Sequence, residues 1–236
     1  MAGALAAAAL FAADVAPRVQ LAAMALVVGA TVWVASRAMP GAVIAMDAAA
    51  PPPRAWPTPA LWLIGALVFA GMTAEGAMHD WTVLYLAQER NLAPSPAALG
   101  YAVFSVAMAA SRFAGDALRQ RFGEARLLGA GAVLAALSML LVLGAPVPAF
   151  AFVGLALVGA GVAPIAPTLY NAAARKGGAH PASAIAAVTA IGYGGLMLGP
   201  PLVGAIAQAA SLTLALAVVV IGPVLVLAFG ARRLER

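Results

Sequence analysis

The chain has 236 residues, of which 64% are hydrophobic and 9% are charged, whereas about a quarter of the residues in a soluble globular domain are charged. This composition excludes an ordinary soluble domain and predicts an all-α membrane protein. The net charge is +5, but the basic residues form short clusters between apolar runs, so the charge indicates topology in a lipid bilayer and no nucleic-acid partner.

The apolar runs predict a polytopic bundle of transmembrane helices. A spanning helix needs about 20 mostly apolar residues, and seven stretches approach this length: roughly 19–36, 60–86, 97–115, 127–144, 148–174, 182–208 and 210–231. The apolar segment 1–13 is too short to cross a membrane and lacks the positive start of a signal peptide. We interpret it as the second half of a helix.

A proline-rich stretch, DAAAPPPRAWPTP, divides the chain. We therefore predict that residues 1–36 are the remnant of an N-terminal half, with a partial helix and one span. Residues 37–59 are predicted to form a cytoplasmic central loop, and residues 60–236 a six-helix transmembrane domain. The connections in this last part are short, so its neighbouring helices are expected to be antiparallel.

The basic residues are distributed unequally between the two sides of the predicted bundle. One side receives eleven Lys and Arg residues, and the other receives only Arg18 and Arg90. Because Lys and Arg concentrate in cytoplasmic loops, we expect a cytoplasmic C-terminus. Arg outnumbers Lys twelve to one and Ala is abundant, as in GC-rich bacterial genes, so the predicted location is a bacterial inner (plasma) membrane.

Four segments resemble parts of one transporter family. SRFAGDALRQRFG, residues 111–123, is similar to the cytoplasmic signature that the major facilitator superfamily places between its second and third helices and repeats between its eighth and ninth. GAGVAPIAPTLYNAAAR (159–175) and GYGGLMLGPPLVGAIAQ (192–208) resemble its tenth and eleventh helices, and AEGAMHDW (74–81) resembles the seventh helix of its sugar-permease-like bacterial branch. This resemblance implies helices five to twelve of such a transporter, with the first four and a half absent.

The signature segment supplies candidate gating residues. The resemblance implies a hairpin whose charges pair with neighbouring helix ends, formed by Gly115, Asp116, Arg119 and Arg121. Arg112 and Asp116 are four residues apart, so we also expect them to pair at the cytoplasmic mouth and to separate when a cavity opens inward. The alternative is that these charges only set the topology.

Glu75 and His79 lie in the span 60–86, where a lipid-facing helix would carry no ionisable side chain. Glu75 is about 22 Å along its helix, past the middle of the bilayer. We predict a protonatable site that couples proton movement to solute movement; the alternative is a Glu that only fixes helix packing. His79 is one turn away at i+4, so the two side chains could share a proton or a solute hydroxyl.

Asp80 and Trp81 follow in the same span. A carboxylate beside an aromatic face suits a solute with hydroxyl groups, so we predict solute contact or gating. The alternative is a place at the outer membrane interface, where Trp81 and Tyr85 would lie among the lipid headgroups.

Two further residues are placed on the solute pathway. Tyr193 lies in a glycine-rich stretch in which Gly195 and Gly199 have the spacing of close helix packing, the default role of these glycines. Asn171 follows Pro164 and Pro167, which are expected to bend the helix and to serve as a hinge. The alternative for Asn171 is a place at the membrane interface.

We conclude that the most suitable function is secondary transport of a small solute by alternating access, coupled to protons, in an apparently N-terminally truncated chain. Such a chain would need a missing N-terminal half, a partner chain or a second copy of itself. The alternative is a non-transporting membrane protein, a truncated relic or an assembly subunit. No enzyme signature, metal site or cofactor is expected, and an intramembrane enzyme is disfavoured because the buried ionisable residues concentrate on one helix.

Overall fold

The computed structural model describes residues 16–38 and 58–231. The predicted half-helix 1–13, most of the predicted loop 37–59 and the last basic residues of the chain lie outside these ranges. The chain separates into two compact units, Met1–Ala55 and Trp56–Arg236, which are described one at a time. The predicted domain boundaries stay a prediction.

In the first unit, helix α2 (Pro17–Ala38) corresponds to the predicted span 19–36. Its 22 residues extend about 33 Å, enough to cross the hydrocarbon core of a bilayer. Its large apolar side chains are exposed, including Leu21 and Leu26. At its C-terminal end the guanidinium carbon of Arg37 lies 4.0 Å from the ring centroid of Trp33, a pairing suited to a membrane interface.

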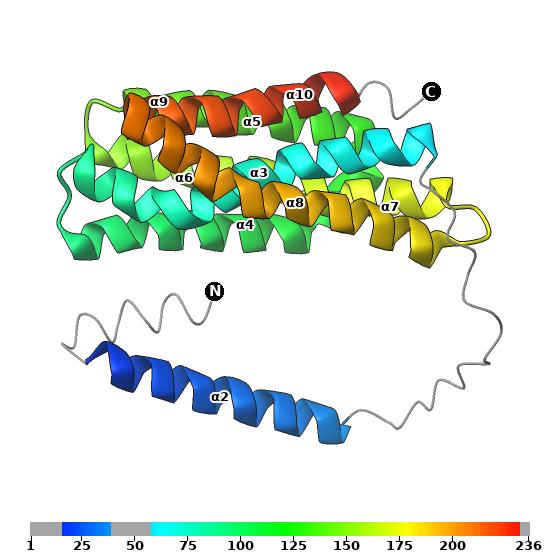
Figure 1. The fold of residues 1–236 in the computed structure, drawn as a ribbon, viewed down its shortest axis with the longest axis horizontal. Coiled ribbons are helices and arrows are strands. Elements are labelled where there is room, and N and C mark those ends of the chain that lie inside the picture. Colours follow the sequence, from blue (N-terminus) through cyan, green and yellow to red (C-terminus); the bar gives the residue numbers. More distant parts are fainter. Residues whose placement is uncertain (1–15, 39–57, 232–236) are drawn as a thin grey trace. The chain divides into compact units, whose positions relative to one another are not determined.

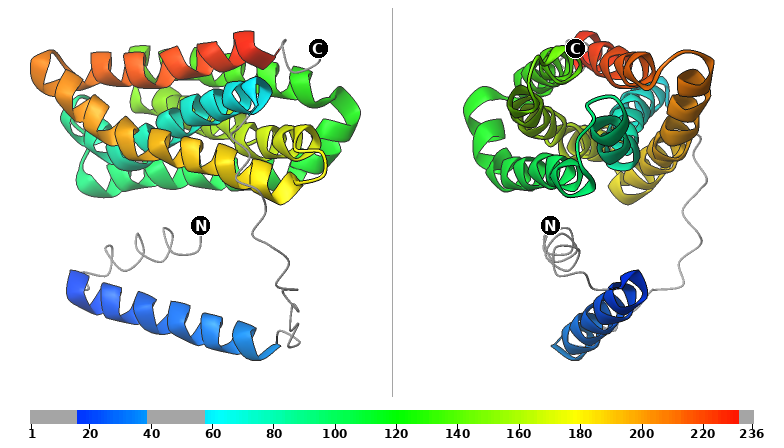
Figure 2. Two further views of the ribbon diagram at one scale, coloured as in Figure 1. Left: turned by 45° about the vertical axis from the view of Figure 1, so that its right-hand side comes forward. Right: turned by 90° about the vertical axis from the view of Figure 1, so that its left-hand side faces the viewer.

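The second unit is a bundle of helices that run along one common direction (Figures 1 and 2). In chain order its elements are α3 (Pro59–Gln88), α4 (Pro94–Phe122), α5 (Glu124–Gly144), α6 (Pro148–Val162), α7 (Ile165–Lys176), α8 (Pro181–Ala209), α9 (Leu212–Leu216), the π-helix η1 (Ala217–Ile221) and α10 (Gly222–Ala231).

Proline begins most of the long helices of this unit, because the first helical position needs no backbone N–H donor. Thr58 additionally caps α3, its hydroxyl accepting a hydrogen bond from the backbone N–H of Leu61. The turn between α4 and α5 consists of Gly123, whose φ of +78° is a conformation that favours glycine.

Seven helical segments of the described residues are long and apolar enough to cross a membrane, which confirms the predicted all-α polytopic fold. Three spans differ from the prediction in detail. Helix α4 continues to Phe122, through most of the signature segment. The predicted span 148–174 is divided into α6 and α7 at Pro164, as expected from a ring that cannot donate a hydrogen bond. The last span contains the π-helix just before Pro223.

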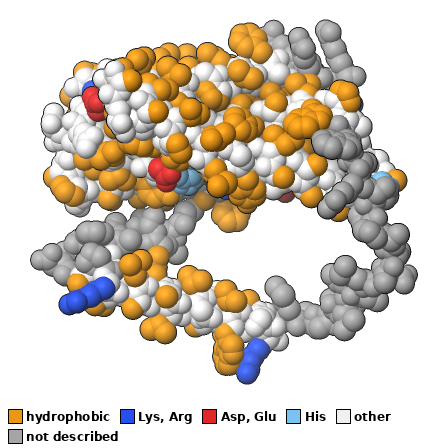
Figure 3. Space-filling model, in the orientation of Figure 1, with side chains coloured by type: hydrophobic (Ala, Val, Ile, Leu, Met, Phe, Trp, Pro, Cys, Tyr) orange, Lys and Arg blue, Asp and Glu red, His pale blue; other side chains and the backbone are white. Residues whose placement is uncertain are grey.

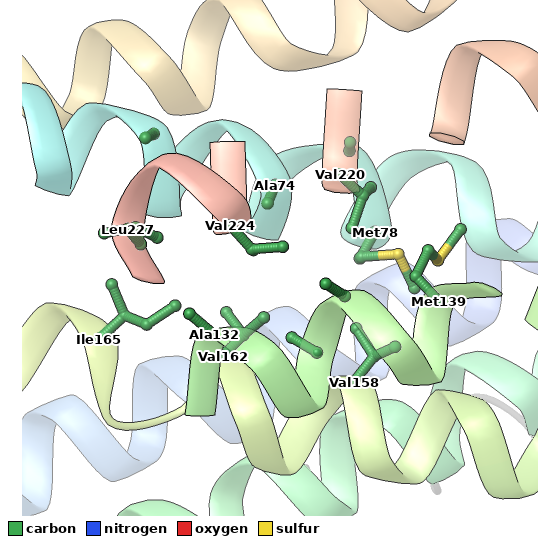
Figure 4. Close-up of a cluster of buried hydrophobic side chains, with 14 of the residues drawn as sticks. Ala74, Met78, Ala132, Met139, Val158, Val162, Ile165, Val220, Val224 and Leu227 are labelled. Carbon is green, nitrogen blue, oxygen red and sulfur yellow. The ribbon is translucent and has the colours of Figure 1, made fainter. Parts of the chain in front are cut away.

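The core of the second unit surrounds α3, the most buried of its spans. Figure 4 shows side chains from several helices meeting there, among them Met78 of α3, Met139 of α5 and Leu227 of α10. The surface visible in Figure 3 is largely hydrophobic as well, with only a few charged and histidine side chains. A bundle that is apolar both inside and outside is what a lipid environment requires.

Helix α8 packs against α3 more extensively than any other pair of elements in the described part of the chain. The reason is a row of glycines on α8. A Cβ atom on Gly195 would lie 2.2 Å from the carbonyl oxygen of Phe69, and one on Gly199 would lie 2.7 Å from that of Thr73. The packing role expected for these glycines therefore agrees with the structure.

Candidate functional site

An ion pair joins α3 and α4 near the middle of both helices. The Nη2 atom of Arg112 lies 2.9 Å from Oε1 of Glu75. Glu75 is about 24 Å along the axis of α3 from Pro59, and Arg112 is about 15 Å from the C-terminal end of α4 at Phe122. The Glu75 side chain is only 15% exposed and that of Arg112 is 44% exposed.

This pair corrects two expectations for Arg112. The predicted bond between Arg112 and Asp116 is wrong, because Arg112 reaches across to Glu75 and Asp116 pairs with Arg119 on its own helix. Arg112 is also not one of the basic loop residues that set the topology. An arginine in the interior of a span is stabilised by a carboxylate partner, and Glu75 supplies one at that level of the bundle.

His79 extends the cluster toward the other end of α3. Its Nε2 atom lies 3.6 Å from Oε1 of Glu75, so the predicted i,i+4 pairing of these two side chains is present. Its Nδ1 atom lies 2.9 Å from the hydroxyl oxygen of Tyr101 on α4. The buried ring of Phe104 packs edge-on against the imidazole, with 5.7 Å between centroids.

Tyr101 is the member of this cluster that sequence reasoning missed. It precedes Arg112 by 11 residues, which is about three helical turns. The two side chains therefore share one face of α4, and both meet α3 there. This spacing is the signal that could have identified Tyr101.

The signature segment does not form the predicted hairpin. Gly115 lies inside α4, and the turn comes only at Gly123. Asp116 contacts Arg119 of the same helix, and the guanidinium carbon of Arg121 lies 5.4 Å from the ring centroid of its neighbour Phe122. The ion pair that does join two helix ends here was not expected.

That ion pair connects α5 and α7. Both terminal nitrogens of Arg175, in the last turn of α7, donate to the carboxylate of Glu124 in the first turn of α5. The geometry is bidentate, the strong form of an arginine–carboxylate contact. It ties the segment that follows the Pro164 break to the neighbouring helix.

Asp80 and Trp81 lie along an open groove between α3 and α8, lined on the α8 side by Pro200, Pro201, Gly204, Ala205 and Gln208. Asp80 is exposed, and the partly buried Trp81 packs over Gly204. The indole Nε1 atom of Trp81 is buried without a hydrogen-bond partner among the described residues. Figure 1 shows α3 and α8 side by side, consistent with their extensive contact.

Tyr85 is not the interfacial side chain that we expected beside Trp81, because it is 2% exposed. Its hydroxyl accepts a hydrogen bond from Nε of Arg90, whose Nη1 atom also donates to the carbonyl of Ala145 at 2.9 Å and whose Nη2 atom donates to that of Val142 at 2.8 Å. Arg90, expected only as a topology charge, thus satisfies carbonyl groups at the C-terminal end of α5.

Tyr193 and Asn171 lie apart from the charged cluster. Tyr193 is 52% exposed on α8, and Asn171 is partly buried in α7, after the Pro164 break. Within the described ranges neither side chain hydrogen bonds to Glu75, His79 or Arg112. The structure therefore brings together Glu75, His79 and Arg112, whereas Tyr193 and Asn171 lie elsewhere. The roles of all the predicted site residues stay predictions.

A family model described as Major Facilitator Superfamily matches residues 61–236. Among curated proteins, an uncharacterized MFS-type transporter of Yersinia pestis is 36% identical over 163 residues, 69% of this chain and 41% of the relative. Membrane protein MosC of Rhizobium meliloti is 33% identical over 156 residues, 66% of this chain and 38% of the relative. The chain spans about two fifths of the length of these relatives.

A solved structure adds evidence on the fold. The major facilitator superfamily transporter FucP, crystallised in the outward conformation, matches with a TM-score of 0.66 and 20% identity over 75% of this chain and 43% of that chain. At this identity the likeness concerns the fold alone. The family expected from the four sequence segments is confirmed by the family model, which matches most of the chain. The chain belongs to the major facilitator superfamily.

Proposed function

We propose that this chain forms the C-terminal six-helix half of a secondary transporter, which moves a small solute by alternating access and couples it to protons through Glu75. The observation that carries the proposal is the ion pair between Glu75 and Arg112, near the middle of two apolar helices. Charged groups at this depth cost about 2.5–3.5 kcal/mol each on insertion scales and usually belong to a pathway for ions or solutes.

The pair offers a physical basis for coupling. An ionised Glu75 holds Arg112 against α3, whereas a protonated Glu75 is neutral and no longer attracts the guanidinium. The half-exposed Arg112 side chain is then free to move away from α3. Because the two protonation states favour different contacts between α3 and α4, a proton can shift the balance between two conformations.

The solute is proposed to lie in the open groove between α3 and α8. The groove beside Asp80 and Trp81 offers a carboxylate and an aromatic edge for a solute with hydroxyl groups. Tyr193 and Asn171 stay candidates for the same pathway, and the break at Pro164 stays the candidate hinge. Gating by the signature residues Arg112, Asp116 and Arg119 is part of this proposal.

Solute sites in this superfamily lie between two six-helix halves. We propose that the second half is supplied by a preceding segment, by a separately encoded chain or by a second copy. The proposed location is a bacterial plasma membrane, with the loop between α7 and α8 and the C-terminus on the cytoplasmic side. The alternative is a non-transporting membrane protein in which Glu75 only joins α3 to α4.

The test is solute accumulation by the complete transporter that contains this chain, in vesicles with an imposed pH gradient and a panel of radiolabelled sugars and small metabolites. We expect Glu75→Gln to abolish accumulation driven by the gradient and to leave membrane insertion intact. The matched control is Glu89→Gln, which removes a carboxylate from the C-terminal end of α3 and should preserve accumulation. Unchanged accumulation in Glu75→Gln would refute the coupling role.

A further inference from the structure

Three side chains hold the imidazole of His79 in one orientation. The Tyr101 hydroxyl lies 2.9 Å from Nδ1, and Oε1 of Glu75 lies 3.6 Å from Nε2 on the opposite side of the ring. The rings of Tyr101 and Phe104 both meet the imidazole edge-on, each with 5.7 Å between centroids. Phe104 is completely buried, so this side of the imidazole rests against the protein core.

The chemistry of these groups determines where the imidazole carries its proton. An ionised carboxylate attracts an N–H group and repels a bare ring nitrogen, so Oε1 of Glu75, 3.6 Å from Nε2, favours the imidazole that carries its proton on Nε2. In a neutral imidazole the other nitrogen is then an acceptor, and Nδ1 receives the hydrogen of the Tyr101 hydroxyl. The Tyr101 hydroxyl therefore points its hydrogen toward His79, and the Nε2–H group of His79 points toward Glu75.

We propose that Tyr101 is a positioning residue that holds His79 in its Nε2–H tautomer, so that His79 is the group that passes a proton to Glu75. This inference rests on the proposed proton coupling at Glu75. His79 is 35% exposed at its side chain, and when the Tyr101 hydroxyl rotates away from Nδ1, this nitrogen can take a proton from a hydronium ion, which leaves water and an imidazolium. The Nε2–H bond then breaks, an O–H bond forms on Oε1 of Glu75, and a neutral imidazole with its proton on Nδ1 remains.

A phenol hydroxyl suits this role because it is a stronger hydrogen-bond donor than acceptor, so it favours the tautomer in which Nδ1 is bare. Tyr101 donates to the bare Nδ1, and after rotation of the hydroxyl it can accept a weaker hydrogen bond from Nδ1–H. A phenylalanine at this position would keep the ring contacts but could do neither. Tyr101 is thus assigned to the orientation of His79, and the reacting groups are His79 and Glu75.

No other ionisable group competes for these atoms in the part of the chain that the structure describes. The hydrogen bonds and ion pairs of Glu75 and His79 come from each other and from Tyr101 and Arg112 of α4. The other elements packed against α3, namely α7, α8, α9, η1 and α10, contribute none among the described residues. Arg112 binds the same oxygen as His79, which keeps Glu75 ionised until the proton arrives.

The experiment is nitrogen NMR of the 236-residue chain in lipid nanodiscs, with ¹⁵N-labelled histidine, at a pH at which both imidazoles are neutral. The chain has two histidines, so His79→Gln assigns the spectrum, and the exposed His180 at the start of α8 serves as an internal reference. We expect Nε2–H to dominate in His79. Tyr101→Phe should lower the ratio of the Nε2–H to the Nδ1–H tautomer about fivefold, as expected for one lost hydrogen bond, and should leave His180 unchanged.

The matched control is Tyr170→Phe, which removes a phenol hydroxyl from α7 and should leave the tautomers of His79 unchanged. A dominant Nδ1–H tautomer in the unmodified chain would overturn the proposal, and so would a ratio that changes by less than about twofold in Tyr101→Phe. These outcomes are independent of solute flux. If the tautomers respond as expected but Glu75→Gln still accumulates solute, the proposed function fails and the positioning role of Tyr101 stands.

Discussion

Glu75 and Arg112 compensate each other's charge in the interior of two apolar helices. Glu75 is largely buried, so loss of the guanidinium leaves a carboxylate with His79 as its remaining ionic partner. Removing one member of a buried pair is far more costly than removing both, because the remaining charge is then uncompensated. The free energy of unfolding should therefore depend on the pair, and not on either residue alone.

A double-mutant cycle tests this dependence. We expect Glu75→Gln and Arg112→Gln each to lower the free energy of unfolding, and the double variant to be more stable than the sum of the two effects predicts, with a coupling of about 1–3 kcal/mol. Unfolding in mixed micelles of increasing SDS content measures the three variants. The control cycle uses Asp116 and Arg119, where the aspartate is 85% exposed, and should give about 0–1 kcal/mol. Equal coupling in the two cycles would contradict the buried character of the Glu75 pair.

Arg90 shows a different use of an arginine. Its guanidinium group caps the C-terminal end of α5 by donating hydrogen bonds to the carbonyl groups of Val142 and Ala145. The same group donates a hydrogen bond to the Tyr85 hydroxyl. The orphan carbonyls at the end of a helix need such donors, and lysine could not reproduce the planar arrangement. The residue therefore joins the end of α3 to the connection between α5 and α6, in addition to its effect on topology.

At the scale of helices, α3 and α8 form a pair whose distance is set by glycine. Gly195 allows the backbone of α8 to touch the backbone of α3, whereas the adjacent Gly194 has only ordinary contacts, its Cβ position lying 3.6 Å from the ring of Phe69. These neighbours differ in their surroundings but share the same helix and the same depth. They are therefore a matched pair for a packing experiment.

We expect Gly195→Ala to destabilise the chain by about 1–3 kcal/mol, since the new methyl group would overlap the carbonyl oxygen of Phe69 and must push the two helices apart. Gly194→Ala should be neutral or slightly stabilising, because alanine is the better helix former. Thermal unfolding of both variants in the same detergent gives the comparison. Similar melting temperatures for the two would show that α3 and α8 tolerate a larger separation.

At the scale of the whole molecule, the proposed orientation of the second unit in the membrane rests on its basic residues. Arg119 and Arg121 end α4, and Arg175 and Lys176 end α7, all at the same end of the helix bundle, whereas Arg90 lies at the opposite end. Arg112 lies in the interior of a span and not in a loop, and the asymmetry remains without it. The proposed cytoplasmic side is the end that carries the four basic residues.

Single cysteines test this orientation directly, since the chain contains no cysteine of its own. Ala179 and Ala210 lie in the loops at the two ends of α8. In intact bacterial cells, a thiol reagent that cannot cross the membrane should label Ala210→Cys and not Ala179→Cys, and permeabilised cells should label both. The reverse pattern in intact cells would place the C-terminus outside and contradict the proposed topology.

The residue pattern alone was sufficient for the architecture. Hydrophobic runs of spanning length predicted the helices, and Pro164 and Pro167 predicted a bend in the span 148–174, which the structure divides into α6 and α7. The segments 74–81, 111–123, 159–175 and 192–208 predicted the family. These features are local, because length, composition and the loss of a backbone donor act within one helix. The i,i+4 contact of Glu75 with His79 belongs to the same class, since helical geometry alone brings the two together.

The partners across helices were decided by the tertiary structure. Arg112 had Asp116 within reach on its own helix, yet it binds Glu75, 37 positions away in the sequence. Tyr101 meets His79 and Arg175 meets Glu124 for the same reason, across distances of 22 and 51 positions. Such contacts depend on how far each helix is rotated and shifted against its neighbour. Those angles are set by the packing of many side chains together, including the glycines of α8, and no single segment of the sequence contains them.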